Sequence, residues 1–198
     1  MSITGEDIYF TGRDSKRAAA VISECEAKVP NIKLNFIAHD VASLATVATA
    51  KQLISISQRL DILMCNAGVM ALPPGLTEDG YEVQFGANHM GHDLCGVVFK
   101  DLRTTQDYGL AGQWLRYGQC KLANILYACE LARRYPNITT VSVHPSLWAA
   151  TQDKGKIVNG AYYESFAILG KHDKKSKSEK LAEELWEWTQ KKLEGYQA

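Results

Sequence analysis

Alternation of strand-like and helix-like segments constrains the fold of this chain more than any other feature of its sequence. Residues 8–11 and 32–37 are short runs rich in β-branched and aromatic side chains, whereas residues 15–28 and 43–60 carry apolar residues at helical spacing. The apolar run DILMC, residues 61–65, has the composition of a buried parallel strand. This order predicts a doubly wound α/β fold, with a mostly parallel sheet between two layers of helices.

The second half of the chain continues the alternation. We expect a helix from about residue 78 to 92, a second helix through residues 117–135, and a strand at residues 139–144 closed by Pro145. A chain of 198 residues has the length of one domain, so residues 1–198 are expected to form a single Rossmann-like domain.

A last amphipathic helix is expected at about residues 176–194. Ser176 and Glu179 have the spacing of a capping box at its start. The two tryptophans of the run WEW could form a partner site, but packing on the sheet is the favoured interpretation. Helical spacing places four apolar residues on one face of this helix: Leu181, Leu185, Trp188 and Leu193.

Composition excludes several functional classes. The 22 basic and 22 acidic residues balance, so the chain is not expected to bind nucleic acid. No apolar run approaches the length of a membrane span, and the acidic N-terminal segment does not resemble a signal peptide. The five cysteines are scattered without a C-x-x-C pair, which favours reduced thiols and a cytoplasmic location. The histidines give no metal-site pattern, so no metal is expected.

Tyr117 and Lys121 are the first candidates for chemistry. On a helix, residues four positions apart share one face, so the Lys121 ammonium can stand beside the Tyr117 phenol. A cation beside a phenol favours the phenolate, and such a pair can move a proton to or from an alcohol or ketone. A half-exposed helix with a polar edge has the same pattern, so both interpretations stay open on these residues alone.

Five motifs resemble those of the short-chain dehydrogenase/reductase family in order and approximate spacing. The resemblance extends over nearly the whole chain and is closest to retinol-dehydrogenase-like and WW-domain-oxidoreductase-like members. Each motif alone is weakly specific, but five in register are specific. They are Asp40-Val41 after a strand, Asn66-Ala67-Gly68 after a strand, Asn88 within GANHMGH, Tyr117-x-x-x-Lys121, and His144-Pro145-Ser146.

This resemblance implies an NAD(P)-dependent oxidoreductase that interconverts a small-molecule alcohol with a ketone or aldehyde. It implies that Tyr117 donates or accepts the proton at the substrate oxygen. Lys121 is then expected to favour the phenolate and to bind the nicotinamide ribose. Asn88 is expected to hold a helix kink and the water that relays protons to Lys121.

The resemblance also implies cofactor-binding positions. Asn66, Ala67 and Gly68 are expected to line the cofactor and to brace the central sheet, and Asp40 to bind the adenine region. Arg13 stands where a cation for the 2′-phosphate is common, which favours NADP over NAD. Asp40 could instead cap the following helix, and Arg13 could simply be solvated.

Three departures from the family pattern shape the functional expectation. The sequence lacks a G-x-x-x-G-x-G turn, a strand with a catalytic serine, and substrate-binding helices between Thr151 and Gly160. The fold is therefore expected to be incomplete relative to the family, with weak cofactor binding and sheet edges that favour a homodimer. The alternatives are a pseudoenzyme, a binding subunit, a cofactor-independent isomerase, or an incomplete gene model.

Overall fold

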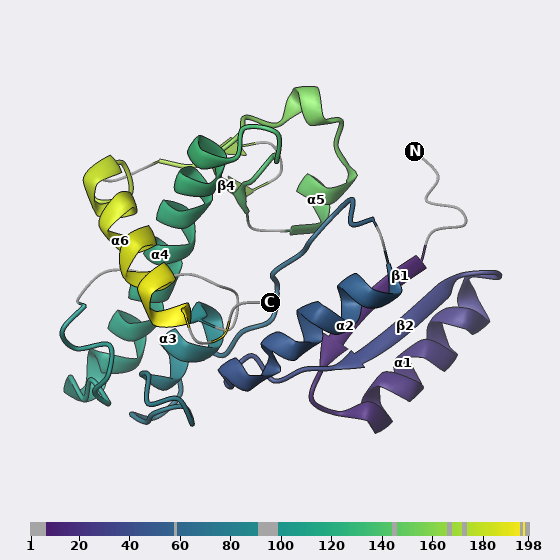
Figure 1. The fold of residues 1–198 in the computed structure, drawn as a ribbon, viewed down its shortest axis with the longest axis horizontal. Helices are drawn as coiled ribbons and strands as arrows, with labels where there is room; N and C mark the ends of the chain where they lie inside the picture. The colour runs from purple at the N-terminus through teal and green to yellow at the C-terminus, as the bar shows by residue number, and fades with distance from the viewer. Residues whose placement is uncertain are drawn as a thin grey trace. The chain divides into compact units, whose positions relative to one another are not determined.

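The computed structural model describes residues 7–57, 59–90, 99–143, 146–165, 168–171, 174–194 and 196. The chain forms two compact units, one of residues 1–40 and 45–59 with residue 198, and one of residues 41–44 and 60–197. Both contain helices and a small sheet with parallel strands (Figure 1). The α/β class is confirmed, in the form of an incomplete Rossmann-like fold. The single domain stays a prediction.

The first unit contains a two-stranded parallel sheet. Strands β1 (Asp7–Gly12) and β2 (Lys33–Ala38) pair in register, which sets Phe10 opposite Phe36 with ring centroids 5.4 Å apart. Parallel neighbours require a crossover, and helix α1 (Ser15–Lys28) supplies it. Both predicted strands are confirmed.

Capping explains where helix α1 begins and ends. The Asp14 side chain accepts hydrogen bonds from the backbone N–H groups of Lys16 and Arg17, at 2.9 and 3.0 Å. The helix ends one residue before Val29, which precedes Pro30, because the residue before proline disfavours the helical conformation. The predicted helix at residues 15–28 is confirmed.

The next predicted helix, residues 43–60, is shorter than expected. A 3-10 turn, η1 (Leu44–Val47), precedes helix α2 (Ala48–Ile56). The hydroxyl of Ser57 donates to the Arg59 carbonyl at 2.8 Å, and such local side-chain bonds compete with helix extension. Apolar spacing alone does not detect this competition.

Three helices build the second unit: α3 (Val83–Asn88), α4 (Gly112–Arg134) and α6 (Glu179–Leu193). The predicted helix at 78–92 begins only at Val83, because Gly80 has a φ of 75° and Leu76 forms an isolated bridge with Glu82. Residues 91 and 92 of that prediction lie outside the described residues. The helix predicted through 117–135 is confirmed and begins earlier.

Helix α6 packs along α4 in Figure 1. Leu185 and Leu193 are buried in the core, and Leu181 and Trp188 pack against it, so the predicted apolar face is confirmed. Two details were wrong. The helix is capped by Ser178 rather than Ser176, since the Ser178 hydroxyl accepts from the Leu181 N–H at 3.2 Å. Trp186 stacks on a helix rather than a sheet, 4.8 Å from the Tyr127 ring on α4.

A three-stranded sheet completes the second unit. Strand β4 (Tyr162–Ser165) lies between β3 (Ser142–Val143), with which it is parallel, and β5 (Ile168–Leu169), with which it is antiparallel. The strand predicted at 139–144 is therefore confirmed only at its centre, and His144-Pro145 lies outside the described residues. The short connecting helices are η3 (Gly109–Ala111), α5 (Ser146–Thr151) and η4 (Lys154–Lys156). None of the described helices is both long and apolar enough to cross a membrane.

The buried strand predicted at residues 61–65 was wrong. The segment has no strand conformation, and Ile62, Leu63 and Met64 are 52%, 70% and 45% exposed. A strand needs a neighbour that satisfies its backbone hydrogen bonds, and no described strand pairs with this segment. The apolar composition is that of a strand, but composition does not supply the pairing partner.

Candidate functional site

Asn88 joins two of the sequence motifs. It is the last residue of α3, it is buried, and its side-chain amide forms two hydrogen bonds with the backbone of Val69. Oδ1 accepts from the Val69 N–H at 2.5 Å, and Nδ2 donates to the Val69 carbonyl at 2.7 Å. A side chain at Gly68 would place its Cβ 2.8 Å from Asn88 Oδ1, so only glycine permits this approach. Segment Asn66–Gly68 is thereby fixed against α3.

Tyr117 and Lys121 lie together on α4. Tyr117 is half-buried, and Lys121 is exposed. The Lys121 ammonium lies over the Tyr117 ring, 5.0 Å from its centroid, which is a cation–π contact. The contact shown is with the face of the Tyr117 ring, and the acid/base role of the two residues stays a prediction.

Cys120 lies between Tyr117 and Lys121 in the sequence of α4. Its side chain is fully buried, and its thiol donates to the Arg116 carbonyl at 3.1 Å. Burial raises the pKa of the Cys120 thiol far above its usual range, so the group stays neutral and serves packing. The sequence analysis did not single out Cys120.

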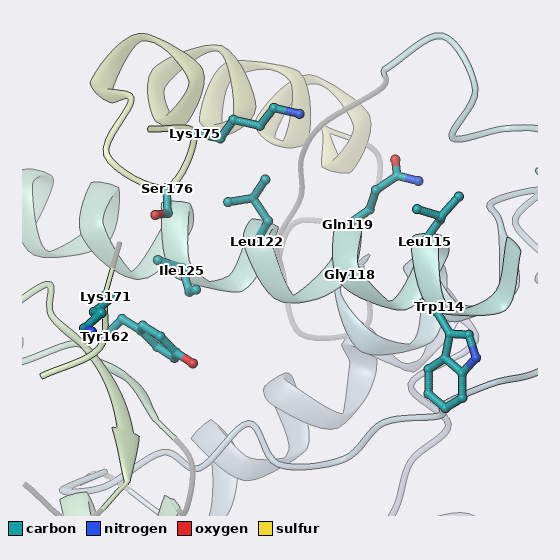
Figure 2. Close-up of a pocket in the computed structure, with 10 residues that line it drawn as sticks. All are labelled: Trp114, Leu115, Gly118, Gln119, Leu122, Ile125, Tyr162, Lys171, Lys175 and Ser176. Atoms are coloured by element: carbon teal, nitrogen blue, oxygen red, sulfur yellow. The ribbon is translucent and has the colours of Figure 1, made fainter. Parts of the chain in front are cut away.

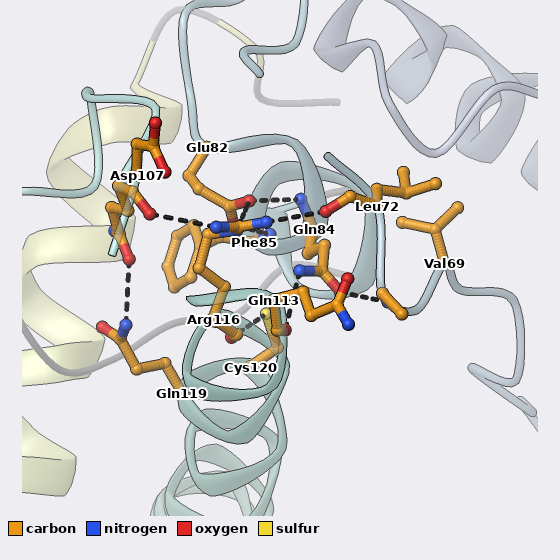
Figure 3. A network of polar contacts seen from close by, with 12 residues as sticks. Val69, Leu72, Glu82, Gln84, Phe85, Asp107, Gln113, Arg116, Gln119 and Cys120 are labelled. Carbon is orange, nitrogen blue, oxygen red and sulfur yellow. Dashed lines mark hydrogen bonds and ion pairs between the residues drawn. The ribbon is translucent and has the colours of Figure 1, made fainter. Parts of the chain in front are cut away.

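A buried ion pair joins Glu82, the residue that caps α3, to Arg116 on α4. Figure 3 shows its contacts. Arg116 Nε is 3.0 Å from Glu82 Oε1, and each side chain is only 1% exposed. Glu82 also accepts from the N–H groups of Gln84 and Phe85, at 3.1 and 2.7 Å. Burial raises the pKa of Glu82, while these hydrogen bonds and Arg116 oppose the rise.

The remaining donors of Arg116 bind two loops. Nη2 donates to the Leu72 carbonyl at 2.6 Å, and Nη1 donates to the Gln106 carbonyl at 3.0 Å. Glu82 caps the start of α3, and Arg116 lies on α4 one residue before Tyr117. The Arg116 guanidinium therefore links α3 and α4 to the loop that follows Gly68. The sequence analysis missed this pair, although an arginine on the core-facing side of an apolar helix signals a buried acidic partner.

Arg13 and Asp40 meet in the first unit, after the carboxyl ends of β1 and β2. Their Nη1 and Oδ2 atoms are 4.0 Å apart, and the side chains are 69% and 40% exposed. An exposed guanidinium at this end of a parallel strand can meet an anionic ligand. The other predicted site residues belong to the second unit.

The histidines and acidic residues give no metal centre. Buried His89 places Nδ1 2.8 Å from Asn124 Oδ1 on α4, and its ring lies 5.0 Å from that of Phe85. Within the described ranges, no group of three or more His, Cys, Asp or Glu side chains could hold a metal ion.

Comparison with known proteins gives relatives but no matching family model. An uncharacterized oxidoreductase of Schizosaccharomyces pombe is 29% identical over 182 residues, covering 72% of this chain and 53% of the relative. Mouse retinol dehydrogenase 14 is 36% identical over 138 residues, covering 54% and 40%. The short-chain dehydrogenase/reductase drtF of Aspergillus calidoustus is 27% identical over 192 residues, covering 77% and 60%.

A solved structure supports the fold. The crystal structure of an uncharacterized protein from Mycobacterium paratuberculosis aligns with a TM-score of 0.71 at 23% identity, covering 92% of this chain and 82% of that one. The chain spans about half the length of the curated relatives it matches. Over most of its own length, this chain is therefore a relative of the retinol dehydrogenases and other short-chain dehydrogenases/reductases.

Proposed function

We propose that the chain is an NAD(P)-dependent oxidoreductase that interconverts an alcohol with a ketone or aldehyde. One observation carries the proposal. The Asn88 amide binds the backbone of Val69, directly after Asn66–Gly68, and Arg116, one residue before Tyr117, binds the Leu72 carbonyl of the same loop. These positions are far apart in sequence, and a fold without a site has no need to gather them. The named relatives include oxidoreductases and dehydrogenases.

Tyr117 is the proposed acid and base. In the direction of reduction, its hydroxyl donates a proton to the substrate carbonyl oxygen, and in oxidation the phenolate accepts the proton of the alcohol. The Lys121 ammonium lies 5.0 Å from the centroid of the Tyr117 ring, one helical turn away on α4. Asn88 holds the neighbouring backbone in place through its contacts with Val69.

The resemblance to the short-chain dehydrogenases/reductases implies a nicotinamide dinucleotide, which would supply a hydride when bound. The exposed Arg13 guanidinium suits a 2′-phosphate, so NADP is the preferred cofactor and NAD the alternative. Segment Asn66–Gly68 is exposed, and Gly68 carries no side chain that would obstruct a ligand. Binding is expected to be weak, because the printed sequence has no G-x-x-x-G-x-G turn to receive the pyrophosphate.

A second candidate is a relative that binds ligand without redox turnover. The observation that favours it is the exposed run 61–65, which leaves Asn66 without a supporting strand before it. Such a protein could be a binding subunit, or an isomerase that uses Tyr117 and Lys121 without cofactor.

Substitution of Tyr117 by phenylalanine tests the two candidates. NADPH oxidation is followed with a panel of aldehydes and ketones, and melting temperature is followed by circular dichroism. Tyr117→Phe should abolish reduction and leave the melting temperature nearly unchanged, while the matched control Tyr135→Phe at the other end of α4 should keep activity. A Tyr117→Phe variant that retains turnover would remove Tyr117 from the mechanism. A wild-type chain that oxidises no NADPH would favour the second candidate.

A further inference from the structure

Gln84 of α3 binds two segments that are distant from each other in sequence. Its side chain is fully buried. The side-chain oxygen Oε1 accepts a hydrogen bond from the Ala71 N–H at 2.9 Å, and Nε2 donates to the Gln113 carbonyl at 3.0 Å (Figure 3). Gln113 lies in the first turn of α4. One amide therefore joins the loop of residues 69–72 to the helix that carries Tyr117.

The backbone conformation of Ala71 needs such support. Its φ is 57°, in the left-handed region, where an L side chain is strained. Alanine stays in this region only where the surrounding structure holds it, and strained residues of this kind gather at active sites and ligand clamps. The hydrogen bond from Gln84 is one contact that holds Ala71 in this conformation.

Two other buried side chains hold the residues on either side of this position. Asn88 binds the N–H and the carbonyl of Val69, and Arg116 Nη2 donates to the Leu72 carbonyl. Gln84 and Asn88 are four positions apart on α3, so their amides lie on one face of that helix. Three of the four loop residues are thus bonded by buried side chains, and the loop backbone is ordered before a ligand binds.

We infer that Gln84 is a positioning residue of the proposed site. It holds Ala71 in its strained conformation and so fixes segment Asn66–Gly68, which leads into the loop. The inference rests on the proposed function, in which Asn66–Gly68 lines the cofactor. A loop that is ordered in advance need not be ordered when the cofactor binds. A looser loop should therefore weaken cofactor binding and leave proton transfer at Tyr117 unchanged.

Hydrogen exchange at single amides tests the contact itself. Gln84→Met keeps the length of the side chain but removes both of its hydrogen bonds, so the Ala71 N–H should exchange about tenfold faster or more. The Val69 N–H keeps its own side-chain partner and should exchange at nearly the wild-type rate. Unchanged exchange of Ala71 in this variant would overturn the role of Gln84.

The matched control is Gln119→Met, which makes the same chemical change on α4. The Gln119 amide donates to the Gln106 side chain at 2.9 Å, and Gln119 lines the pocket shown in Figure 2, whose lining residues include none from loop 69–72. This control should leave the exchange of Ala71 and the binding of cofactor at their wild-type values. Weaker cofactor binding in Gln119→Met, equal to that in Gln84→Met, would reduce Gln84 to a general stabilising role and overturn the inference.

Steady-state kinetics with NADPH and NADH test the role of Gln84 in the site. Gln84→Met should raise the KM for both cofactors by the same factor, about threefold to tenfold, because the loop follows a segment proposed to contact the part they share. The kcat should stay within about twofold of the wild-type value. A wild-type KM, in a variant whose Ala71 N–H exchanges faster, would overturn the inference. A lower kcat with unchanged KM would overturn it too.

Wild-type exchange with and without NADPH provides the test if Gln84→Met does not fold. NADPH should slow exchange at Val69 and Ala71, and it should leave the Thr140 N–H unchanged, which is bonded to the Asn159 side chain at 2.7 Å. Unchanged loop exchange at a concentration where NADPH binds would overturn the inference and leave the proposed function intact. A wild-type chain that binds no NADPH would overturn the proposed function and, with it, this role of Gln84.

Discussion

Two arginine–carboxylate pairs of the same chemistry lie in opposite environments in this molecule. Arg116 and Glu82 are 3.0 Å apart in the core of the second unit with side chains 1% exposed, whereas Arg13 and Asp40 are 4.0 Å apart on the first unit and largely exposed. Water screens the exposed pair and leaves Arg13 able to exchange its partner. The buried pair cannot be hydrated, so its partners must stay together. The first pair suits ligand exchange and the second suits positioning.

The largest expected effect comes from breaking the buried pair. Arg116→Met leaves the Glu82 carboxylate buried without its cation and removes the donors to Leu72 and Gln106, so unfolding should cost about 3–5 kcal/mol less. Urea denaturation measures this change. Arg17→Met, at an exposed position of α1, is the control and should change stability by less than about 0.5 kcal/mol.

The double variant Glu82→Gln with Arg116→Met sharpens this result. Because the uncompensated charge is removed, the double variant should be more stable than Arg116→Met alone, with a coupling within the usual range of about 0.5–3 kcal/mol. Additive losses would mean that the pair contributes no mutual stabilisation and that its environment differs from the one described.

The next largest loss of stability is expected at Asn88, because its buried side chain is polar but uncharged. Asn88→Ala leaves the N–H and carbonyl of Val69 without their amide partner, so stability should fall by about 1–3 kcal/mol and oxidoreductase activity should fall with it. The control is Asn159→Ala, whose amide accepts from the Thr140 N–H at an exposed position. Equal losses of stability for Asn88→Ala and Asn159→Ala would show that burial does not determine the free-energy cost of removing the amide.

Glu130 on α4 lies between the two extremes, since its buried carboxylate bonds the partly exposed Arg133 and Arg134. Hydrogen bonding to Arg133 holds the pKa of Glu130 below its usual value. Its contribution to stability is therefore present above the unfolded-state pKa, about 4.5, and lost as the pH falls through the folded-state value. Glu130→Gln should flatten the fall in melting temperature below this pH, and the exposed control Glu183→Gln should not.

Arg13→Gln should have the smallest effect on stability, less than about 1 kcal/mol, because it removes an exposed ion pair. Its effect on ligand binding should be selective. Affinity for NADPH should fall by more than affinity for NADH, since only NADPH carries the 2′-phosphate. Equal affinity losses for the two cofactors would assign Arg13 to a part of the ligand that they share.

Sequence reasoning succeeded where interactions are local. Strands β1 and β2 and helix α1 follow from residue spacing, the Asp14 cap and Pro30, and proximity of Tyr117 to Lys121 follows from their positions on one helix. It failed at residues 61–65, because apolar composition predicts a strand without showing whether a partner is available.

Contacts between distant segments required other information. The contacts of Asn88 with Val69 were not predicted, because the family resemblance assigned Asn88 to a helix kink and to a water beside Lys121. The Glu82–Arg116 pair was missed, because nothing local to either residue identifies a partner on another element. The contacts of Gln84 were missed for the same reason, since its two partners lie on separate segments.

Calorimetric titration of the wild-type chain with NADPH tests the central claim, that this chain is a nicotinamide-dependent oxidoreductase with weakened cofactor binding. Loss of a few charge-assisted hydrogen bonds should move the dissociation constant to the high micromolar range, roughly 100 μM to 1 mM. Measurable NADPH binding in this range, weakened by Arg13→Gln, is the predicted result. No detectable heat at millimolar NADPH would contradict the account.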